Sequence, residues 1–169
     1  MSAVIKIAGV VKESIVDGPG IRYVVFAQGC KHQCRGCHNP GTHSFDEGSF
    51  VDTDSIIEQM KANPLLDGIT LSGGDPFEQA EGFAELAQRA RTSGYSVMTY
   101  TGYTYEEIIK NMSQKQGWAK LMENTDILVD GRFEETKKNL MLNFRGSDNQ
   151  RIIDVTKSLA MDEIIHIKF

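Results

Sequence analysis

Few cysteines, few prolines and no long apolar run characterise this 169-residue sequence, which contains three cysteines, four prolines and one tryptophan. No apolar run is long enough to cross a membrane, so we do not expect a membrane protein. Basic residues do not outnumber acidic ones: the formal net charge is −5. Lys and Arg are scattered along the chain, which does not support nucleic-acid binding. Without a repeat, a low-complexity tract or a linker, the sequence predicts a single domain over residues 1–169.

Two further absences concern compartment and catalysis. Residues 1–6 contain too few apolar side chains for a secretory signal, so we expect a cytoplasmic protein with reduced cysteines. The sequence shows no His/Asp pair and no paired carboxylates, so it offers no candidate for acid–base catalysis.

All three cysteines, Cys30, Cys34 and Cys37, lie within one short stretch, called here the cysteine loop (residues 30–37). Gly29 and Gly36 favour a loop over a helix. A [4Fe–4S] cluster normally takes four thiolates. Three cysteines would therefore bind three irons and leave the fourth without a protein ligand.

The same three cysteines are also compatible with a buried helix face or a zinc site. Their offsets would place them on one face of a helix, as a buried stripe. A zinc site of the Cys3His type is possible, because His32, His38 and His43 lie nearby. A disulfide is disfavoured, because it would leave an odd thiol and no export signal is found.

Strand-like and helix-like segments alternate along the chain. Helix starts are marked by capping residues at Asp52 or Thr53, Asp75 and Thr104. Runs rich in β-branched residues, or alternating in polarity, predict strands over residues 4–11, 21–27, 67–71, 95–100, 126–129, 151–155 and 165–169. Crossovers long enough for parallel pairing predict an α/β fold, an open, partial (β/α) barrel of about five to six mainly parallel strands.

Four polar or glycine-rich stretches directly follow expected strands: the cysteine loop, residues 72–76, residues 99–102, and Asp130-Gly131. Because the carboxyl ends of parallel strands meet at one edge of a sheet, we expect these stretches to form one site. Gly73 and Gly74 lack side chains there, which would let a ligand approach the backbone.

With these residues in view, the chain resembles the radical S-adenosylmethionine (SAM) enzymes, and among them the family that activates anaerobic ribonucleoside-triphosphate reductase. The resemblance starts from the Cys-x3-Cys-x2-Cys spacing. It extends over nearly the whole chain through Asp17-Gly18-Pro19-Gly20 with Arg22, Cys37-His38-Asn39, Ser72-Gly73-Gly74-Asp75-Pro76, Val129-Asp130-Gly131 with Phe133, and Arg145-Gly146-Ser147 with Asn149-Gln150.

The resemblance implies a [4Fe–4S] cluster ligated by Cys30, Cys34 and Cys37. It also implies a SAM site beside the cluster, made by two groups of residues: Gly36, Cys37 and His38 in and after the cysteine loop, and Gly73, Gly74 and Asp75 after a later strand. The second group would receive the methionine amino group of SAM. The resemblance assigns no firm role to Thr99 or Asp130.

The implied activity is reductive cleavage of SAM to a 5′-deoxyadenosyl radical, which would generate a glycyl radical on the large subunit of the reductase. A reductant such as flavodoxin or ferredoxin would supply the electron. Two enzyme alternatives are an activator of another glycyl-radical enzyme and a 7-carboxy-7-deazaguanine synthase. The non-enzyme alternative is a zinc-stabilised interaction module.

Overall fold

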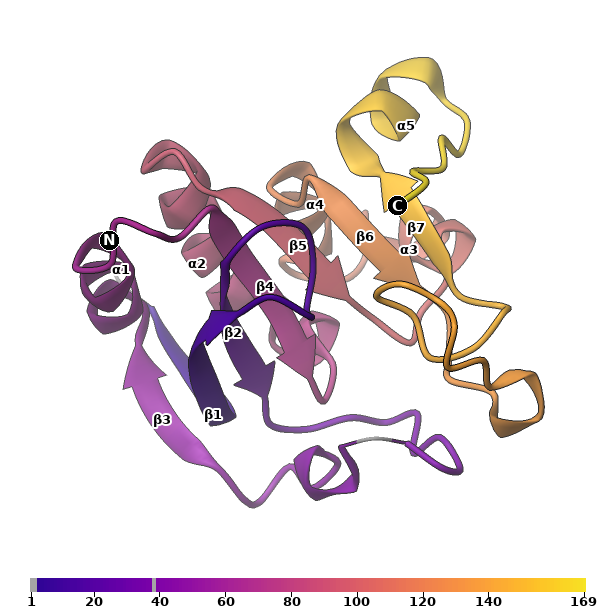
Figure 1. The fold of residues 1–169 in the computed structure, drawn as a ribbon, viewed down its shortest axis with the longest axis horizontal. Helices are drawn as coiled ribbons and strands as arrows, with labels where there is room; N and C mark the ends of the chain where they lie inside the picture. Colours follow the sequence, from indigo (N-terminus) through magenta and orange to yellow (C-terminus); the bar gives the residue numbers. More distant parts are fainter. Residues whose placement is uncertain (1–2, 38) are drawn as a thin grey trace.

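The computed structural model describes residues 3–37 and 39–169 of the chain. The strands are β1 (Val4–Ser14), β2 (Arg22–Ala27), β3 (Ser49–Asp52), β4 (Gly68–Gly73), β5 (Ser96–Tyr100), β6 (Ile127–Asp130) and β7 (Arg151–Asp154). In the described residues these seven strands form one sheet in the order β3-β1-β2-β4-β5-β6-β7, which does not close on itself (Figure 1).

The described residues also form five α-helices and three 3₁₀ turns. The helices are α1 (Thr53–Lys61), α2 (Ala80–Thr92), α3 (Tyr105–Asn111), α4 (Trp118–Glu123) and α5 (Val155–Met161). The 3₁₀ turns are η1 (Pro40–Thr42), η2 (Pro76–Gln79) and η3 (Glu135–Lys137).

The centre of the sheet is parallel and its edges are antiparallel. β2, β4, β5 and β6 pair in parallel, because helices carry the chain back between successive strands. β1 is joined to β2 by residues 15–21 alone and pairs with it antiparallel. The segment 131–150 contains no α-helix to cross the sheet, so β7 starts at the edge where β6 ends and runs antiparallel to it. The expected α/β fold with an open sheet is confirmed, but parallel pairing is confined to the centre.

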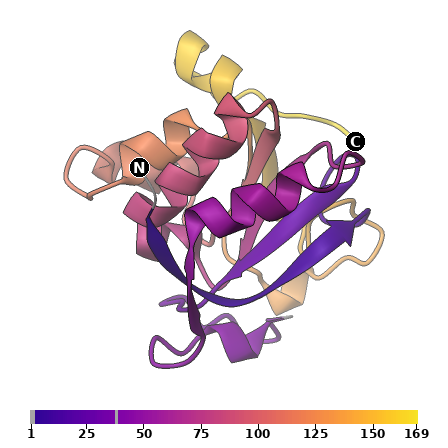
Figure 2. The same ribbon diagram turned by 90° about the vertical axis from the view of Figure 1, so that its left-hand side faces the viewer.

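One face of the sheet carries the main core. Apolar side chains of α1, α2 and α4 pack against the strands there, and Figure 2 shows the helices lying across this face of the curved sheet. The opposite face holds a smaller cluster of Met98, Val129 and Ile152, packed with Tyr100 and Phe144. The connection 15–21 crosses this second face in front of β4 (Figure 1). The two faces therefore differ: one is covered by helices and the other by irregular segments.

The capping residues behave as their sequence predicts. Asp52 accepts a hydrogen bond from Asp54 N at the start of α1, and Thr104 accepts one from Glu107 N at the start of α3. Asp75 accepts from Phe77 N, but the element it opens is η2, which leads into α2.

Three parts of the expected order are wrong. Residues 49–52, which none of the expected strands includes, form β3, because their backbone pairs with residues 4–7 of β1 although most of their side chains are exposed. Residues 165–169 make a single bridge, between Ile153 and His166, in place of the expected strand. α5 was not predicted, because only Val155 and Ser158 among its residues are buried. The sheet has seven strands, more than the five to six expected for the barrel.

Candidate functional site

A cavity of about 420 Å³ opens at the carboxyl ends of β2, β4, β5 and β6. This volume lies within the range of about 300–1,000 Å³ that is typical of small-molecule sites. Residues after all four strands line it, among them Cys30, Cys34, Cys37, Gly73, Gly74, Thr101, Gly102 and Gly131. The structure thus brings together the four stretches that the topology was expected to assemble.

The cysteine loop is fixed where it leaves β2. Gly29 N donates to Thr42 O at 2.7 Å and Cys30 N donates to His43 O at 3.1 Å. The buried Gln28 side chain donates to the carbonyls of Gly41 and Ser44. The start of the loop is therefore held by the turn at residues 41–44.

The three thiols face the same cavity with different exposure. Cys30 is buried, whereas Cys34 and Cys37 are partly exposed. Burial raises the pKa of the Cys30 thiol, and burial likewise raises that of Cys34 against the opposing effect of the Phe133 backbone amide. Because a thiolate is the form that binds metal, both side chains must lose a proton when they become ligands.

Gly73 and Gly74 lie where no side chain fits. A Cβ on Gly73 would lie 2.5 Å from Ala27 N, and one on Gly74 would lie 2.4 Å from Gly29 O. Gly73 also has a positive φ of 89°. The close approach of β4 to the end of β2 therefore requires both glycines, and it leaves their backbone exposed to the cavity.

The Asp75 carboxylate lies behind these glycines and is fully buried. It accepts hydrogen bonds from Phe77 N, Thr101 Oγ1 and Gly102 N and lies 2.8 Å from His32 Nε2. Asp75 is not among the residues that line the cavity. Its carboxylate joins the ends of β4 and β5 to the cysteine loop.

The other predicted SAM contacts differ in their position relative to the cavity. Gly36 packs near Phe133 and Glu135 and does not line the cavity, whereas Cys37 does. His38 lies outside the described residues. Thr99 is buried and hydrogen-bonded to Thr125, away from the cavity.

Two walls of the cavity were not assigned from the sequence. The connection 15–21 contributes Val16 and Asp17, and the segment 131–150 contributes Phe133, Phe144 and Arg145. The only sequence signal for these walls is the set of motifs around Asp17, Phe133 and Arg145 that the family resemblance includes.

Arg22 holds the first of these walls in place. Its guanidinium is buried and donates to Thr70 Oγ1 at 2.8 Å and to Pro19 O at 3.0 Å, while Thr70 Oγ1 donates to Asp17 O. Burial lowers the pKa of Arg22 to about 10. The bonds to neutral oxygens keep the connection folded over the cavity.

Three soft thiol ligands facing one cavity fit an iron–sulfur cluster, in which each thiolate binds a different iron. The described residues include no group of three or more Cys, His, Asp or Glu side chains arranged around a single metal ion. Both ring nitrogens of His32 are engaged, by Asp75 and by Arg132 Nε at 3.1 Å, so His32 is not free to complete a zinc site.

The open α/β sheet and its three-cysteine site define a class of iron–sulfur domain. A family model described as "4Fe-4S single cluster domain" matches residues 16–153. That range covers the cysteine loop, all four parallel strands and the whole segment 131–150 that lines the cavity.

Similar proteins narrow the class. An anaerobic ribonucleoside-triphosphate reductase-activating protein from Vibrio cholerae is 38% identical over 146 residues, covering 82% of this chain and 90% of the relative. The proteins of the same name from Escherichia coli K12 and Enterobacteria phage T4 are 36% and 33% identical, covering 80% and 81% of this chain and 90% and 86% of the relatives. This chain belongs to the family of anaerobic ribonucleoside-triphosphate reductase-activating proteins.

Among the helices of residues 3–37 and 39–169, none combines the length and the apolar character needed to span a membrane.

Proposed function

We propose that this chain is a radical SAM activating enzyme for anaerobic ribonucleoside-triphosphate reductase. The observation that carries the proposal is that the chain's three cysteines, and no fourth, line one cavity with the exposed backbone of Gly73 and Gly74. A [4Fe–4S] cluster held by three thiolates leaves one iron to bind a substrate. The names of the relatives supply the target of activation.

In this proposal each element of the site has a defined task. Cys30, Cys34 and Cys37 would ligate the cluster after losing their protons. Gly73 and Gly74, with Asp75 behind them, would receive the methionine amino group of SAM. The remaining proposed SAM contacts are Gly36, Cys37 and His38.

When bound, the cluster and SAM would together supply an electron-driven C–S cleavage whose 5′-deoxyadenosyl radical takes a hydrogen atom from a glycine of the reductase large subunit. The chain would orient SAM and exclude water, with Tyr100, Phe133 and Phe144 providing apolar walls. No residue of the chain is proposed as an acid or a base.

The partial-barrel fold, the compartment and the electron donor are proposals as well. The curvature of the sheet and its four parallel strands support the partial (β/α) barrel of a radical SAM core. We further propose a cytoplasmic protein that receives its electron from a flavodoxin or a ferredoxin, because the cluster and its free thiols require reducing conditions.

Anaerobic reconstitution tests the cofactor proposal directly. The protein should bind about four irons per chain and should cleave SAM when given a chemical reductant. Cys34→Ala should retain the fold, because Cys34 is partly exposed, but should lose SAM cleavage. SAM cleavage by Cys34→Ala at the normal rate would contradict the proposed ligand set.

A second experiment tests the target. Mixing the reconstituted protein with the reductase large subunit, SAM and reductant should produce a glycyl radical signal in electron paramagnetic resonance. SAM cleavage without that signal would favour another glycyl-radical enzyme or a deazaguanine synthase activity. Bound zinc without iron in anaerobically prepared protein would favour a zinc-stabilised module.

A further inference from the structure

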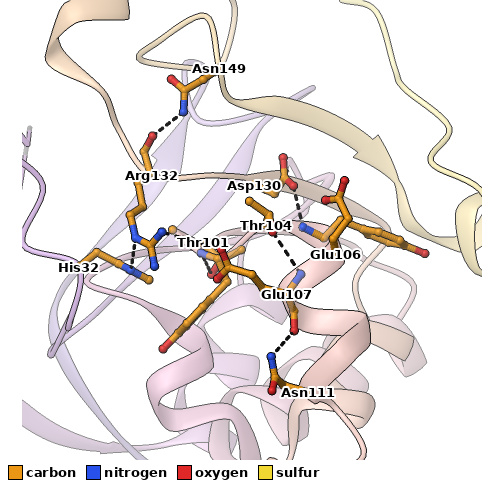
Figure 3. A network of polar contacts seen from close by, with 12 residues as sticks. His32, Thr101, Thr104, Glu106, Glu107, Asn111, Asp130, Arg132 and Asn149 are labelled. Atoms are coloured by element: carbon orange, nitrogen blue, oxygen red, sulfur yellow. Dashed lines mark hydrogen bonds and ion pairs between the residues drawn. The ribbon is translucent and has the colours of Figure 1, made fainter.

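His32 lies between two of the proposed cluster ligands in the sequence, but its two ring nitrogens contact other side chains. Its side chain is only 4% exposed, and its Nε2 lies 2.8 Å from Oδ2 of the fully buried Asp75. Its Nδ1 lies 3.1 Å from Arg132 Nε. Figure 3 shows the two side chains facing each other. His32 thereby contacts two other segments of the chain from the middle of the cysteine loop.

The chemistry of the two partners fixes the tautomer of His32. A guanidinium can only donate hydrogen bonds, so Nδ1 must accept from Arg132. The ring hydrogen therefore lies on Nε2 and is donated to the Asp75 carboxylate. Such a bond to a charged group is shorter and stronger than a bond between neutral groups.

The space around the ring is equally restricted. A Cβ on Gly102 would lie 2.3 Å from His32 Cδ2, so any side chain at this position after β5 would displace the His32 ring. The Tyr103 ring meets the His32 ring edge-on, with centroids 4.5 Å apart. His32 therefore packs against residues that follow β5 while it bonds to residues that follow β4 and β6.

Arg132 is itself held in position. Asn149 Nδ2 donates to Arg132 O at 2.7 Å (Figure 3), and Gln150 Nε2 donates to Gly131 O at 3.0 Å. The next residue, Phe133, directs its backbone amide to the Cys34 sulfur. The part of the segment 131–150 that contacts Cys34 is thus the part that contacts His32.

The cysteine loop has few other anchors between its ends. In the described part of the chain, the one backbone–backbone hydrogen bond of residues 31–36 is the bond that Cys34 O accepts from Cys37 N. Lys31 pairs with Glu78 and Arg35 pairs with Glu135, but the Lys31 and Arg35 side chains are 66% and 95% exposed and such pairs contribute little.

We propose that His32 is a positioning residue that fixes the cysteine loop to the ends of β4, β5 and β6 through Asp75, Gly102 and Arg132, and so sets where the cluster ligands lie. The inference rests on the proposed function. It adds a residue that would bind neither iron nor SAM but would determine how firmly the chain retains the cluster.

Two substitutions separate the two hydrogen bonds of His32. The amide nitrogen of His32→Gln can replace Nε2 as donor to Asp75, whereas the amide oxygen of His32→Asn can replace only Nδ1 as acceptor from Arg132. Arg132→Gln removes the donor of the bond between Arg132 and His32 Nδ1. Arg35→Gln is the matched control, because it makes the same charge change in an exposed pair between the same two segments.

Amide hydrogen exchange of Gly29, Cys30 and Cys37, whose amides donate the backbone hydrogen bonds at the two ends of the cysteine loop, is the first measurement, in the protein without cluster. Exchange should accelerate about tenfold in His32→Asn, because the buried bond from His32 to the charged Asp75 is lost. It should accelerate about twofold in His32→Gln and Arg132→Gln, because the bond between His32 and Arg132 that they lose is half-exposed. The double variant His32→Gln/Arg132→Gln should be no faster than either single variant. Arg35→Gln should match the unmodified protein.

Iron loss to a chelator after anaerobic reconstitution is the second measurement. His32→Asn should lose iron about tenfold faster, the lower end of the effect of removing a supporting residue at a metal site, and His32→Gln should restore most of the retention. Equal rates for His32→Asn and Arg35→Gln in both measurements would overturn the inference, as would additive effects in the double variant. Failure of the protein to take up iron would refute the proposed function. The exchange measurement would still test the role of His32, because it uses the protein without cluster.

Discussion

At the scale of the single residue, the hydroxyl of the partly buried Tyr100 shows how the second face of the sheet is held. Tyr100 OH donates to Phe144 O at 2.7 Å, which joins the end of β5 to the segment 131–150. Burial, and then the charge of Asp17, raise the pKa of Tyr100 above its usual range. The hydroxyl therefore stays protonated in the folded chain at a pH where the unfolded chain ionises.

This difference predicts a pH-dependent effect of Tyr100→Phe. At pH 8 the variant should lose about 1 kcal/mol of unfolding free energy through the missing hydrogen bond. A raised pKa stabilises the fold below the pKa of the unfolded tyrosine, about 10, and this contribution is lost as the pH rises above it. The stability difference between the two proteins should thus shrink from pH 8 to pH 11 in urea unfolding. A constant difference would contradict the assigned burial.

Residue roles were predictable from the sequence where they depend on near neighbours. The cysteine spacing and the Asp75 cap involve residues a few positions apart. The other partners of Asp75 are His32, Thr101 and Gly102, which lie 43, 26 and 27 residues away in the chain. Since no local pattern encodes such pairs, the sequence identified Asp75 but not the network around it.

At the scale of the element, Asp130 joins β6, β7 and α3. Its carboxylate is 1% exposed, accepts from Tyr105 N at 2.7 Å and pairs with Arg151. The hydrogen bonds that Arg151 donates to Asp130 and Glu106 raise the pKa of Arg151. These contacts give the buried Asp130 carboxylate a structural role at the end of β6.

Asp130→Asn should therefore destabilise the fold without changing SAM affinity. We expect a loss of about 2 kcal/mol, the usual range for hydrogen bonds to a charged group. Glu106→Gln is the control: its carboxylate also pairs with Arg151 but is 63% exposed, so it should cost less than about 1 kcal/mol. Urea unfolding and a SAM-binding titration would check both, and weakened SAM binding in Asp130→Asn would show a direct site role.

Elements with strong local signals were predicted, and weak ones were missed. The caps at Asp52 and Thr104 mark the starts of α1 and α3, as observed. β3 depends on backbone pairing with β1, and α5 has few buried residues, so neither has the periodic apolar pattern that a sequence can reveal.

At the scale of the whole molecule, the parallel centre of the sheet explains why one edge carries the site. Three β/α crossovers place the ends of β2, β4, β5 and β6 side by side, so the order of elements alone predicted that their loops converge. The covering segments 15–21 and 131–150 were not predictable in this way, because single long-range contacts, such as the bonds from Thr70 to Asp17 and from Tyr100 to Phe144, hold them.

The central claim is that three cysteines hold a cluster whose remaining iron binds SAM. The most direct test is the Mössbauer spectrum of protein reconstituted anaerobically with ⁵⁷Fe, recorded before and after SAM is added. About one quarter of the iron signal should shift when SAM is added, and the rest should stay unchanged. A spectrum that SAM leaves unaltered, or a protein that takes up no iron, would contradict the claim.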